Sequence, residues 1–286
     1  MAERVHIYEV GPRDGLQNQK NPISTDQKVK LIDLLSLTGL TKIEAASFVS
    51  PQWVPQMADG AQVLAAIQRR PGVAYAALVP NLKGYERARA AGADEVAVFV
   101  SVSEGFSRNN TNCTIAESLE RVKAVSAAAA ADRVPVRGYL SCVIACPYDG
   151  PTPAEAVAAL AGVLLEMGCY QISLGDTIGA GTLDSVARML EAVLRAAPAH
   201  VLAGHYHDTG GRALANICVS LERGLRIFDA SIAGLGGCPF APGAPGNIAT
   251  GATVAFLAQR GYETGIDIDR LAASEHYALE IKGASA

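Results

Sequence analysis

The sequence predicts a (β/α)8 barrel, because eight short runs rich in β-branched residues alternate with longer runs of helical periodicity. The chain has 286 residues, of which 50% are apolar and 18% charged, so it can bury a large core. No linker-like composition divides it, and we expect a single domain over residues 1–286. An open, doubly wound sheet is the architectural alternative.

Each predicted strand is followed by a predicted helix. The strands cover residues 5–10, 41–46, 73–79, 95–101, 134–141, 169–174, 200–205 and 227–232. The helices lie near residues 25–38, 59–69, 83–91, 114–131, 153–167, 181–196, 211–223 and 247–259, and a C-terminal helix covers 267–281. Pro153 in a first helical turn, and Gly92 and Gly168 after last turns, support these boundaries.

Charge and cysteine content exclude several classes of protein. A net charge of −4, with no run of Lys or Arg, argues against a nucleic-acid partner. The 6 cysteines form no Cys-x-x-Cys pair and resemble no disulfide framework, which favours a reducing compartment. The N-terminus shows no signal segment and no apolar run reaches membrane-spanning length, so we expect a cytoplasmic protein with no membrane partner.

Polar side chains gather where the predicted strands end. His205 and His207 leave the same face of an extended backbone, because strand side chains alternate between two faces. Two hydrogen-bonded polar residues at a strand end are the structural alternative for this pattern. In a parallel barrel, however, active-site residues come from strand C-termini and the loops after them. The other candidates at such places are Arg13, Asp14, Gln17, Glu44, Ser47, Asn110, Tyr139, Asp176 and the Gly-rich segment 234–247.

Four of these residues form a mixed oxygen and nitrogen ligand set. They are Asp14, His205, His207 and Asn247. Such a set suits an octahedral divalent ion and leaves two positions open for a chelating substrate. The two imidazoles favour Mn²⁺ on intrinsic affinity, whereas cellular abundance favours Mg²⁺. We therefore expect a divalent metal cofactor, Mg²⁺ or Mn²⁺, and the absence of a thiolate pair argues against a structural zinc site.

Arg13 and Cys238 are the candidates for the chemistry beside this metal. A permanent cation at Arg13 suits a developing enolate or carbonyl oxygen, and an Arg–Asp pair that only closes the barrel mouth is the alternative. Cys238 stands in the Gly-rich loop after the eighth strand, which we expect to be a mobile lid. Its thiol could carry a proton, although a lone cysteine is also often incidental.

Six segments resemble the 3-hydroxy-3-methylglutaryl-CoA lyase family, a branch of the metal-dependent barrels that carry Arg-Asp-Gly or Arg-Glu-Gly after the first strand. They span nearly the whole chain, and GLGGCP with its cysteine is specific to the lyase branch. The segments are VGPRDGLQN (10–18), SFVSPQWVPQM (47–57), SCVIACPYDG (141–150), SLGDTIGAG (173–181), HYHDTGGRALAN (205–216) and AGLGGCPFAPGAPGN (233–247).

The resemblance implies retro-Claisen cleavage of a 3-hydroxyacyl-CoA to acetyl-CoA and a keto acid, acetoacetate for the hydroxymethylglutaryl thioester. It also implies an acyl-CoA substrate and a homodimer. By resemblance, the family's metal ligands correspond to Asp14, His205, His207 and Asn247. The enolate-stabilising arginine corresponds to Arg13, and the catalytic thiol corresponds to Cys238. The residues that line or support the family's site correspond to Glu9, Gln17, Glu44, Ser47, Tyr139 and Asp176, and the candidate bases are Asp14, His205 and Asp176.

The chain departs from the family pattern at two places near these ligands. The pattern has Tyr-Gly after His-x-His-Asp-Thr, where this chain has Gly210-Gly211. It also has Glu-Asp after Asn-x-Ala-Thr, where this chain has Gly251-Ala252. These departures leave open a related substrate such as citramalyl-CoA or a longer branched thioester.

Other functional classes fit the sequence less well. Isopropylmalate- or homocitrate-type condensing enzymes share the metal site, but carry a large C-terminal region and lack the Gly-Gly-Cys-Pro loop. A biotin-dependent carboxyltransferase would need a lysine on a barrel strand, and the lysines here fall mainly in helices and at loop edges. A non-catalytic acyl-CoA binder is the alternative outside enzymes.

Overall fold

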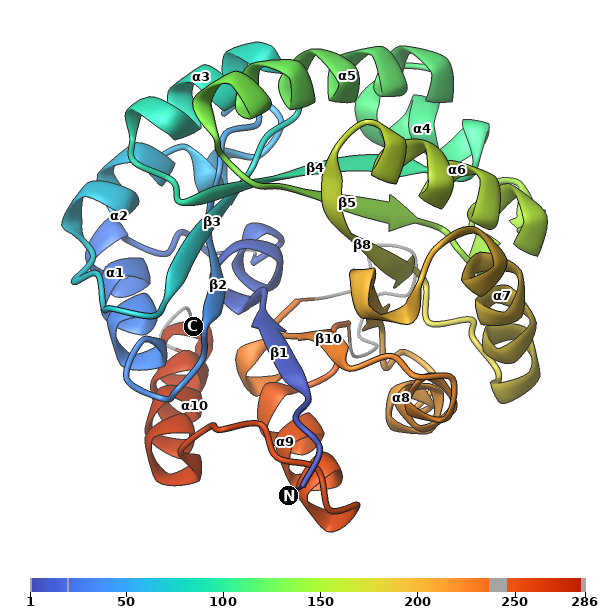
Figure 1. The fold of residues 1–286 in the computed structure, drawn as a ribbon. Coiled ribbons are helices and arrows are strands. Elements are labelled where there is room, and N and C mark those ends of the chain that lie inside the picture. Colours follow the sequence, from blue (N-terminus) through green and yellow to red (C-terminus); the bar gives the residue numbers. More distant parts are fainter. Residues whose placement is uncertain (1, 20, 237–245, 284–286) are drawn as a thin grey trace.

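The computed structural model describes residues 2–19, 21–236 and 246–283, and it has the predicted barrel at its centre (Figure 1). Eight parallel strands close in the order β1-β10-β9-β8-β5-β4-β3-β2, which confirms the (β/α)8 prediction and excludes the open sheet. The strands are β1 (His6–Glu9), β2 (Lys42–Ser47), β3 (Ala74–Leu78), β4 (Glu95–Ser101), β5 (Val136–Ser141), β8 (Cys169–Asp176), β9 (Leu202–Tyr206) and β10 (Ile227–Ala230).

Helices surround this barrel, and the C-terminal α10 packs against α1 (Figure 1). The helices are α1 (Thr25–Leu35), α2 (Gly60–Ala66), α3 (Leu82–Ala90), α4 (Glu104–Thr111), α5 (Ile115–Asp132), α6 (Ala154–Glu166), α7 (Leu183–Ala196), α8 (Ala213–Glu222), α9 (Thr250–Gln259) and α10 (Ile268–Gly283). Among these described helices, none is both long and apolar enough to cross a lipid bilayer.

Alternation along the strands divides the buried side chains into two layers. On β4, Val96, Val98 and Val100 face the helices and join the large core that contains Val122 and Val125 of α5. The residues between them face the barrel interior, where Ala97 and Phe99 contact Tyr139 and Leu78. The outer layer is therefore apolar, and polar residues are left to the inside and the mouth.

Capping residues fix where the helices start. Ser24, Thr114 and Thr182 each accept a hydrogen bond from the backbone N–H three residues later, and that third residue's side chain accepts from the cap's own N–H. These reciprocal bonds satisfy donors that have no partner inside the helix. The observed helix starts lie within two residues of the predicted ones for these three helices.

Two elements near the barrel mouth were absent from the sequence prediction. Helix α4 is rich in Ser, Asn and Thr, which are poor helix formers, but Ser103 caps it and donates a 2.6 Å hydrogen bond to Asp149. The short hairpin of β6 (Ala145–Cys146) and β7 (Gly150–Pro151) carries that aspartate.

Helix α9 starts at Thr250 rather than 247, because Asn247 forms a β-bridge with His207.

Loss of the Thr114 cap should measurably destabilise the fold. We expect Thr114→Ala to lower the free energy of unfolding by about 1 kcal/mol, because the N–H of Glu117, 3.1 Å from Thr114 Oγ1, loses its acceptor. Urea titration followed by circular dichroism measures this, with Thr114→Ser as the matched control that keeps the acceptor. An equal loss in both variants would show that the methyl group of Thr114, and not the cap, matters.

Candidate metal centre and active site

A single π-helical turn, Gly11–Gly15, carries Arg13 and Asp14 into the barrel mouth directly after β1. The N–H of Asp14 donates a 2.7 Å hydrogen bond to the carbonyl of Val10, which draws the chain into this tight turn. A Cβ on Gly11 would lie 2.6 Å from Glu9 Oε1, so the turn requires glycine there. The predicted position of Arg13 and Asp14 after the first strand is thus explained by local backbone geometry.

Asp14, His205 and His207 converge in the mouth. Each offers one ligand atom, and these atoms all lie within 4.8 Å of one another. His205 is at the end of β9, and His207 follows two residues later, so both imidazoles leave the same face. The His-x-His pattern therefore brings both imidazoles next to the Asp14 carboxylate, an arrangement that could hold a metal ion.

Asn247 reaches the cluster because the chain returns along the end of β9. The N–H of Asp208 donates to Gly246 O at 2.7 Å, and the N–H of Ile248 donates to Tyr206 O at 3.2 Å. Asn247 Nδ2 then donates to Asp14 Oδ2 at 2.7 Å. Since a half-turn of the amide exchanges its nitrogen and oxygen, Asn247 can offer its carbonyl oxygen at the same place.

Arg13 lies buried between two carboxylates. Its Nε donates to Glu44 Oε2 at 2.7 Å and its Nη1 donates to Asp14 Oδ1 at 2.6 Å. Tyr139 donates to the same Glu44 oxygen at 3.0 Å, and Gln17 Nε2 donates to Asp14 Oδ1 at 3.2 Å. Five predicted site residues therefore form one connected network, with a fixed guanidinium beside the ligand cluster.

Burial and charge set the protonation of these groups. Burial raises the pKa of Glu44, and the neighbouring Arg13 offsets only part of that rise. Burial also acts on Asp14, but Arg13 and the nearby imidazoles outweigh it and hold the pKa of Asp14 below its usual value. Burial lowers the pKa of His207 to about 4, and a neutral imidazole is the form that binds a metal.

Asp229 is a site-supporting residue that the sequence analysis missed. It lies fully inside the barrel on β10 and accepts hydrogen bonds from Arg137 Nη2 at 2.6 Å and Ser173 Oγ at 2.7 Å. His205 Nδ1 lies 3.0 Å from its Oδ2. This contact makes Nδ1 the donor and leaves Nε2 of His205 free for a ligand in the mouth. A lone aspartate in an apolar strand gave no signal of this role.

The residues fit a divalent metal ion. His207 Nδ1 is buried and has no hydrogen-bond partner among the described residues, nor has Glu44 Oε1. An orphaned buried imidazole nitrogen is costly unless something binds near it. One carboxylate, two imidazoles and an adjacent carboxamide form an oxygen and nitrogen donor set that matches Mn²⁺ or Mg²⁺ better than a thiolate-binding ion.

Comparison with known proteins places this site in a family. The family model described as HMGL-like matches residues 4–277. The chain belongs to the HMGL-like family. It is 55% identical to the mitochondrial hydroxymethylglutaryl-CoA lyase of Gallus gallus, over 94% of this chain and 90% of that protein. A Pseudomonas aeruginosa relative, 54% identical over 95% of this chain and 90% of its own length, is named 3-hydroxy-3-isohexenylglutaryl-CoA/hydroxymethylglutaryl-CoA lyase.

Solved structures agree with this assignment. The HMG-CoA lyase from Brucella melitensis superposes with a TM-score of 0.98 at 59% identity, covering 99% of this chain and 100% of that one. An HMG-CoA lyase from Acinetobacter baumannii, solved with coenzyme A and 3-methylmalate, gives a TM-score of 0.93 at 36% identity over 98% and 92% of the two chains. Members of the HMGL-like family named in these comparisons are carbon–carbon lyases, as this chain is.

The structure places three predicted residues outside the central network. Both oxygens of Asp176 accept backbone hydrogen bonds, from Ala180 at 3.0 Å and Gly181 at 2.8 Å, so it orders the loop after β8. Ser47 is buried at the end of β2, and Asn110 is exposed on α4. Cys238 and most of its loop lie outside the described residues, so the predicted thiol and lid stay predictions.

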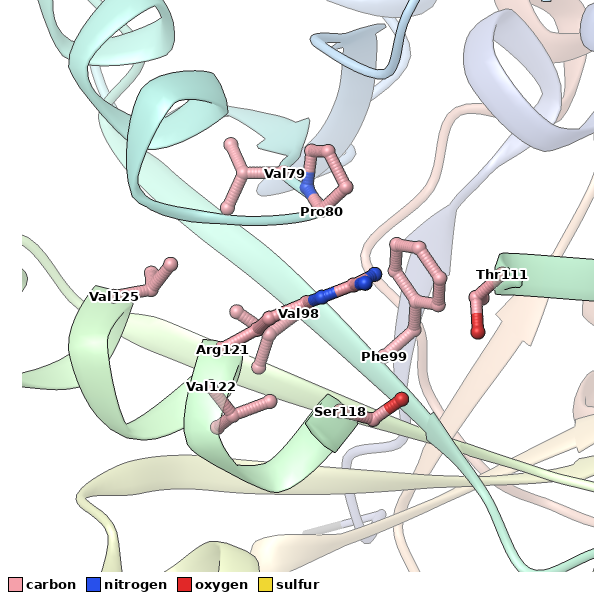
Figure 2. A pocket seen from close by; sticks show the side chains of 9 residues that line it. All are labelled: Val79, Pro80, Val98, Phe99, Thr111, Ser118, Arg121, Val122 and Val125. Atoms are coloured by element: carbon pink, nitrogen blue, oxygen red, sulfur yellow. The ribbon is translucent and has the colours of Figure 1, made fainter. Parts of the chain in front are cut away.

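Two adjoining pockets lie beside the mouth, between α4, α5 and the ends of β3 and β4. In the first, which encloses about 270 Å³ including space open to solvent, Arg121 extends from α5 toward Phe99 and Pro80 (Figure 2). The second shares Phe99, Thr111 and Ser118 with the first and is also bordered by Asn110. Phe99 pairs with Tyr139 in the barrel register, so the pockets begin next to the site network.

At Gly210, where the family pattern has tyrosine, Arg212 fills the space next to the backbone. A Cβ at 210 would lie 2.8 Å from the guanidinium of Arg212, which donates to Gly181 O at 2.9 Å and to Gly179 O at 3.2 Å. Arg212 therefore occupies the space that a side chain at 210 would need. It ties the start of α8 to the loop after Asp176, so an arginine holds this part of the mouth.

Glu9 links the turn after β1 to the two segments that follow β10. Its Oε1 accepts from the N–H groups of Gly11 at 2.7 Å and Ile232 at 2.8 Å, and its Oε2 accepts from Thr250 Oγ1 at 2.6 Å. Burial raises the pKa of Glu9 to about 7, and these hydrogen bonds limit the rise.

Removing the Asp229 carboxylate charge should weaken metal binding. We expect Asp229→Asn to lower Mn²⁺ affinity by about 10- to 100-fold, because the neutral amide removes the charge that holds His205 Nδ1–H and leaves one acceptor oxygen for Arg137, Ser173 and His205. Calorimetric titration of the full-length chain with Mn²⁺ measures this. Ser173→Ala, which removes only a 2.7 Å donor to the same carboxylate, is the matched control and should change affinity far less. Wild-type affinity in Asp229→Asn would contradict the predicted orientation of His205.

The raised pKa of Glu9 should make stability depend on pH. The folded value is about 7 and the ordinary one is 4.5, so the folded state binds this proton more tightly. The stabilising contribution is complete below pH 4.5 and is lost as pH rises through 7. We expect Glu9→Gln to flatten this decline in chelator-treated protein, measured by urea unfolding across that range. The exposed Glu120→Gln is the control, and an unchanged slope in Glu9→Gln would contradict the prediction.

Proposed function

We propose that the chain, acting as a single catalytic domain over residues 1–286, cleaves 3-hydroxy-3-methylglutaryl-CoA to acetyl-CoA and acetoacetate with a divalent metal, Mg²⁺ or Mn²⁺. The observation that carries the proposal is the guanidinium of Arg13, fixed at 2.6 Å from Asp14, beside the Asp14, His205 and His207 cluster. The family and the named lyase relatives support the same reaction.

In the proposed mechanism, Asp14, His205, His207 and Asn247 hold the ion. When bound there, the ion supplies a Lewis acid that lowers the pKa of a substrate hydroxyl. Asp14, His205 or Asp176 accepts the hydroxyl proton. The C–C bond then breaks, its electron pair passes to the thioester carbon fragment, and the former hydroxyl carbon becomes the ketone of acetoacetate.

Arg13 stabilises the enolate that this step leaves on the acetyl-CoA fragment. Because Glu44 and Asp14 hold the guanidinium from two sides, its donors are oriented before the charge develops. Glu44, with Tyr139 bonded to it, fixes Arg13 and lines the site, and Gln17 does the same for Asp14. Cys238 delivers a proton to the enolate carbon, which completes acetyl-CoA. The proposed contacts to the acyl-CoA substrate are Gln17, Ser47, Tyr139 and Asn110.

A longer acyl group is the second candidate substrate. The Pseudomonas aeruginosa relative is named for an isohexenyl as well as a methyl thioester, and the chain has two adjoining pockets next to Phe99 that valine side chains line in part. Hydroxymethylglutaryl-CoA stays first, because several relatives carry that name alone. A homodimer and a cytoplasmic location are further predictions from the resemblance and the sequence, which sedimentation and fractionation would check.

Acetyl-CoA release from purified, Mn²⁺-loaded protein tests the proposal. We expect turnover of hydroxymethylglutaryl-CoA that exceeds turnover of citramalyl-CoA and of a longer branched analogue, and that stops on chelation. Arg13→Gln should lower kcat by about 10²- to 10³-fold and retain Mn²⁺, since it removes the charge that meets the enolate. Arg195→Gln, at an arginine with 59% of its side chain exposed on α7, is the matched control.

Two results would count against the proposal, and a third would change only its substrate. No cleavage of any of these thioesters by metal-loaded protein would remove the lyase. Full activity in Arg13→Gln would remove the role of the guanidinium. Preference for a longer thioester would keep the chemistry and assign the second candidate substrate.

A further inference from the structure

The carboxylate of Glu275, on α10, lies at the start of α9. Its Oε1 accepts a 3.2 Å hydrogen bond from the N–H of Gly251, the second residue of α9. The first N–H groups of a helix have no partner inside it, and a negative charge there is favourable. Glu275 therefore satisfies one of these donors from 24 residues further along the chain.

This carboxylate occupies the place that a side chain at 251 would take. A Cβ on Gly251 would lie 2.3 Å from Glu275 Oε1 and 3.0 Å from its Cδ. Because that carboxylate is the far end of a flexible side chain, a larger residue at 251 would displace Glu275 and leave the backbone in place. A carboxylate can thus reach this position from 251 or from 275, but not from both.

The start of α9 is tied to the candidate site on both sides. Thr250 donates to Glu9, which in turn accepts from the N–H of Gly11 in the turn that carries Arg13 and Asp14. On the other side, Asn247 lies only three residues before Thr250 and reaches Asp14 at 2.7 Å. Whatever holds the first turn of α9 therefore also holds Asn247 and the acceptor of Glu9.

We propose that Glu275 is a positioning residue of the active site, which supplies from α10 the carboxylate that the family pattern places at 251. It holds the first turn of α9, and through it Asn247 and the Glu9 contact, in the geometry that binds the metal. Gly251 is then an adaptation to Glu275 and not a loss of support. This role in catalysis rests on the proposed lyase activity, whereas its role in metal binding does not.

A charge swap tests the assignment. We expect Glu275→Ala to weaken Mn²⁺ binding, measured by calorimetry on the full-length chain, by about tenfold and to lower kcat by a similar factor. Gly251→Glu alone should also weaken binding, since two carboxylates then compete for one place. The double variant Gly251→Glu/Glu275→Gly should recover Mn²⁺ affinity to within about threefold of wild type.

Controls separate this role from general stability and from the lyase proposal. Glu280→Ala removes an exposed glutamate from the same helix and should leave Mn²⁺ affinity unchanged. Glu275→Gln keeps the shape without the charge and should fall between Glu275→Ala and wild type. Wild-type affinity in Glu275→Ala, or a double variant as weak as the worse single variant, would overturn the inference. If Glu275→Ala loses Mn²⁺ affinity but the wild-type protein cleaves no thioester, only the lyase proposal is rejected.

Discussion

Asp229, buried in the barrel interior, is the group on which the arrangement of the mouth depends. It lies on β10 and receives Arg137 from β5, Ser173 from β8 and His205 from β9. The Cζ atom of Arg137 lies 4.0 Å from the ring centroid of Tyr8 and 5.0 Å from that of Tyr139. Breaking such a buried pair leaves a charge without a partner, which costs about 3–5 kcal/mol. The ion pair therefore fixes both the barrel interior and the direction of the His205 imidazole.

Around Asp229, three further carboxylates each accept hydrogen bonds from a different segment of the mouth. Glu9 joins β1 to the start of α9, Glu44 holds Arg13, and Asp176 orders the loop after β8. Each restricts one segment of the mouth. Glu44 Oε1 and His207 Nδ1 remain without partners among the described residues, and these are the atoms at which binding relieves a buried, unpaired polar group.

The barrel and most of the site were predictable because their signals are local. The strand and helix periods gave eight units, and strand ends identified Arg13, Asp14 and the two histidines. Helix α4 was missed because its polar residues resemble a loop and its cap depends on Asp149 in a distant hairpin. Asp229 was missed because its partners stand on three other strands, and no pattern in its own strand reports them.

Glu275 shows a different limit of sequence reasoning. In the sequence, only the departure at 251 was visible, where this chain has glycine and the family pattern has glutamate. Its counterpart lies on another helix, and only the packing of α10 against the start of α9 brings the two positions together. Arg212 and Gly210 repeat the arrangement within a single loop. Departures from a family pattern are thus interpretable once the neighbour that fills the vacated space is known.

The pairing of β1 with β10 has a consequence for biosynthesis. Asp14 and Asn247 are 233 residues apart in sequence, and the Glu9 and Thr250 contact spans 241. A ribosome releases the first of each pair long before the second, so the nascent chain has no closed barrel until β10 has emerged. The proposed ligand set of Asp14, His205, His207 and Asn247 can therefore assemble only after Asn247, 233 residues beyond Asp14, has been synthesised.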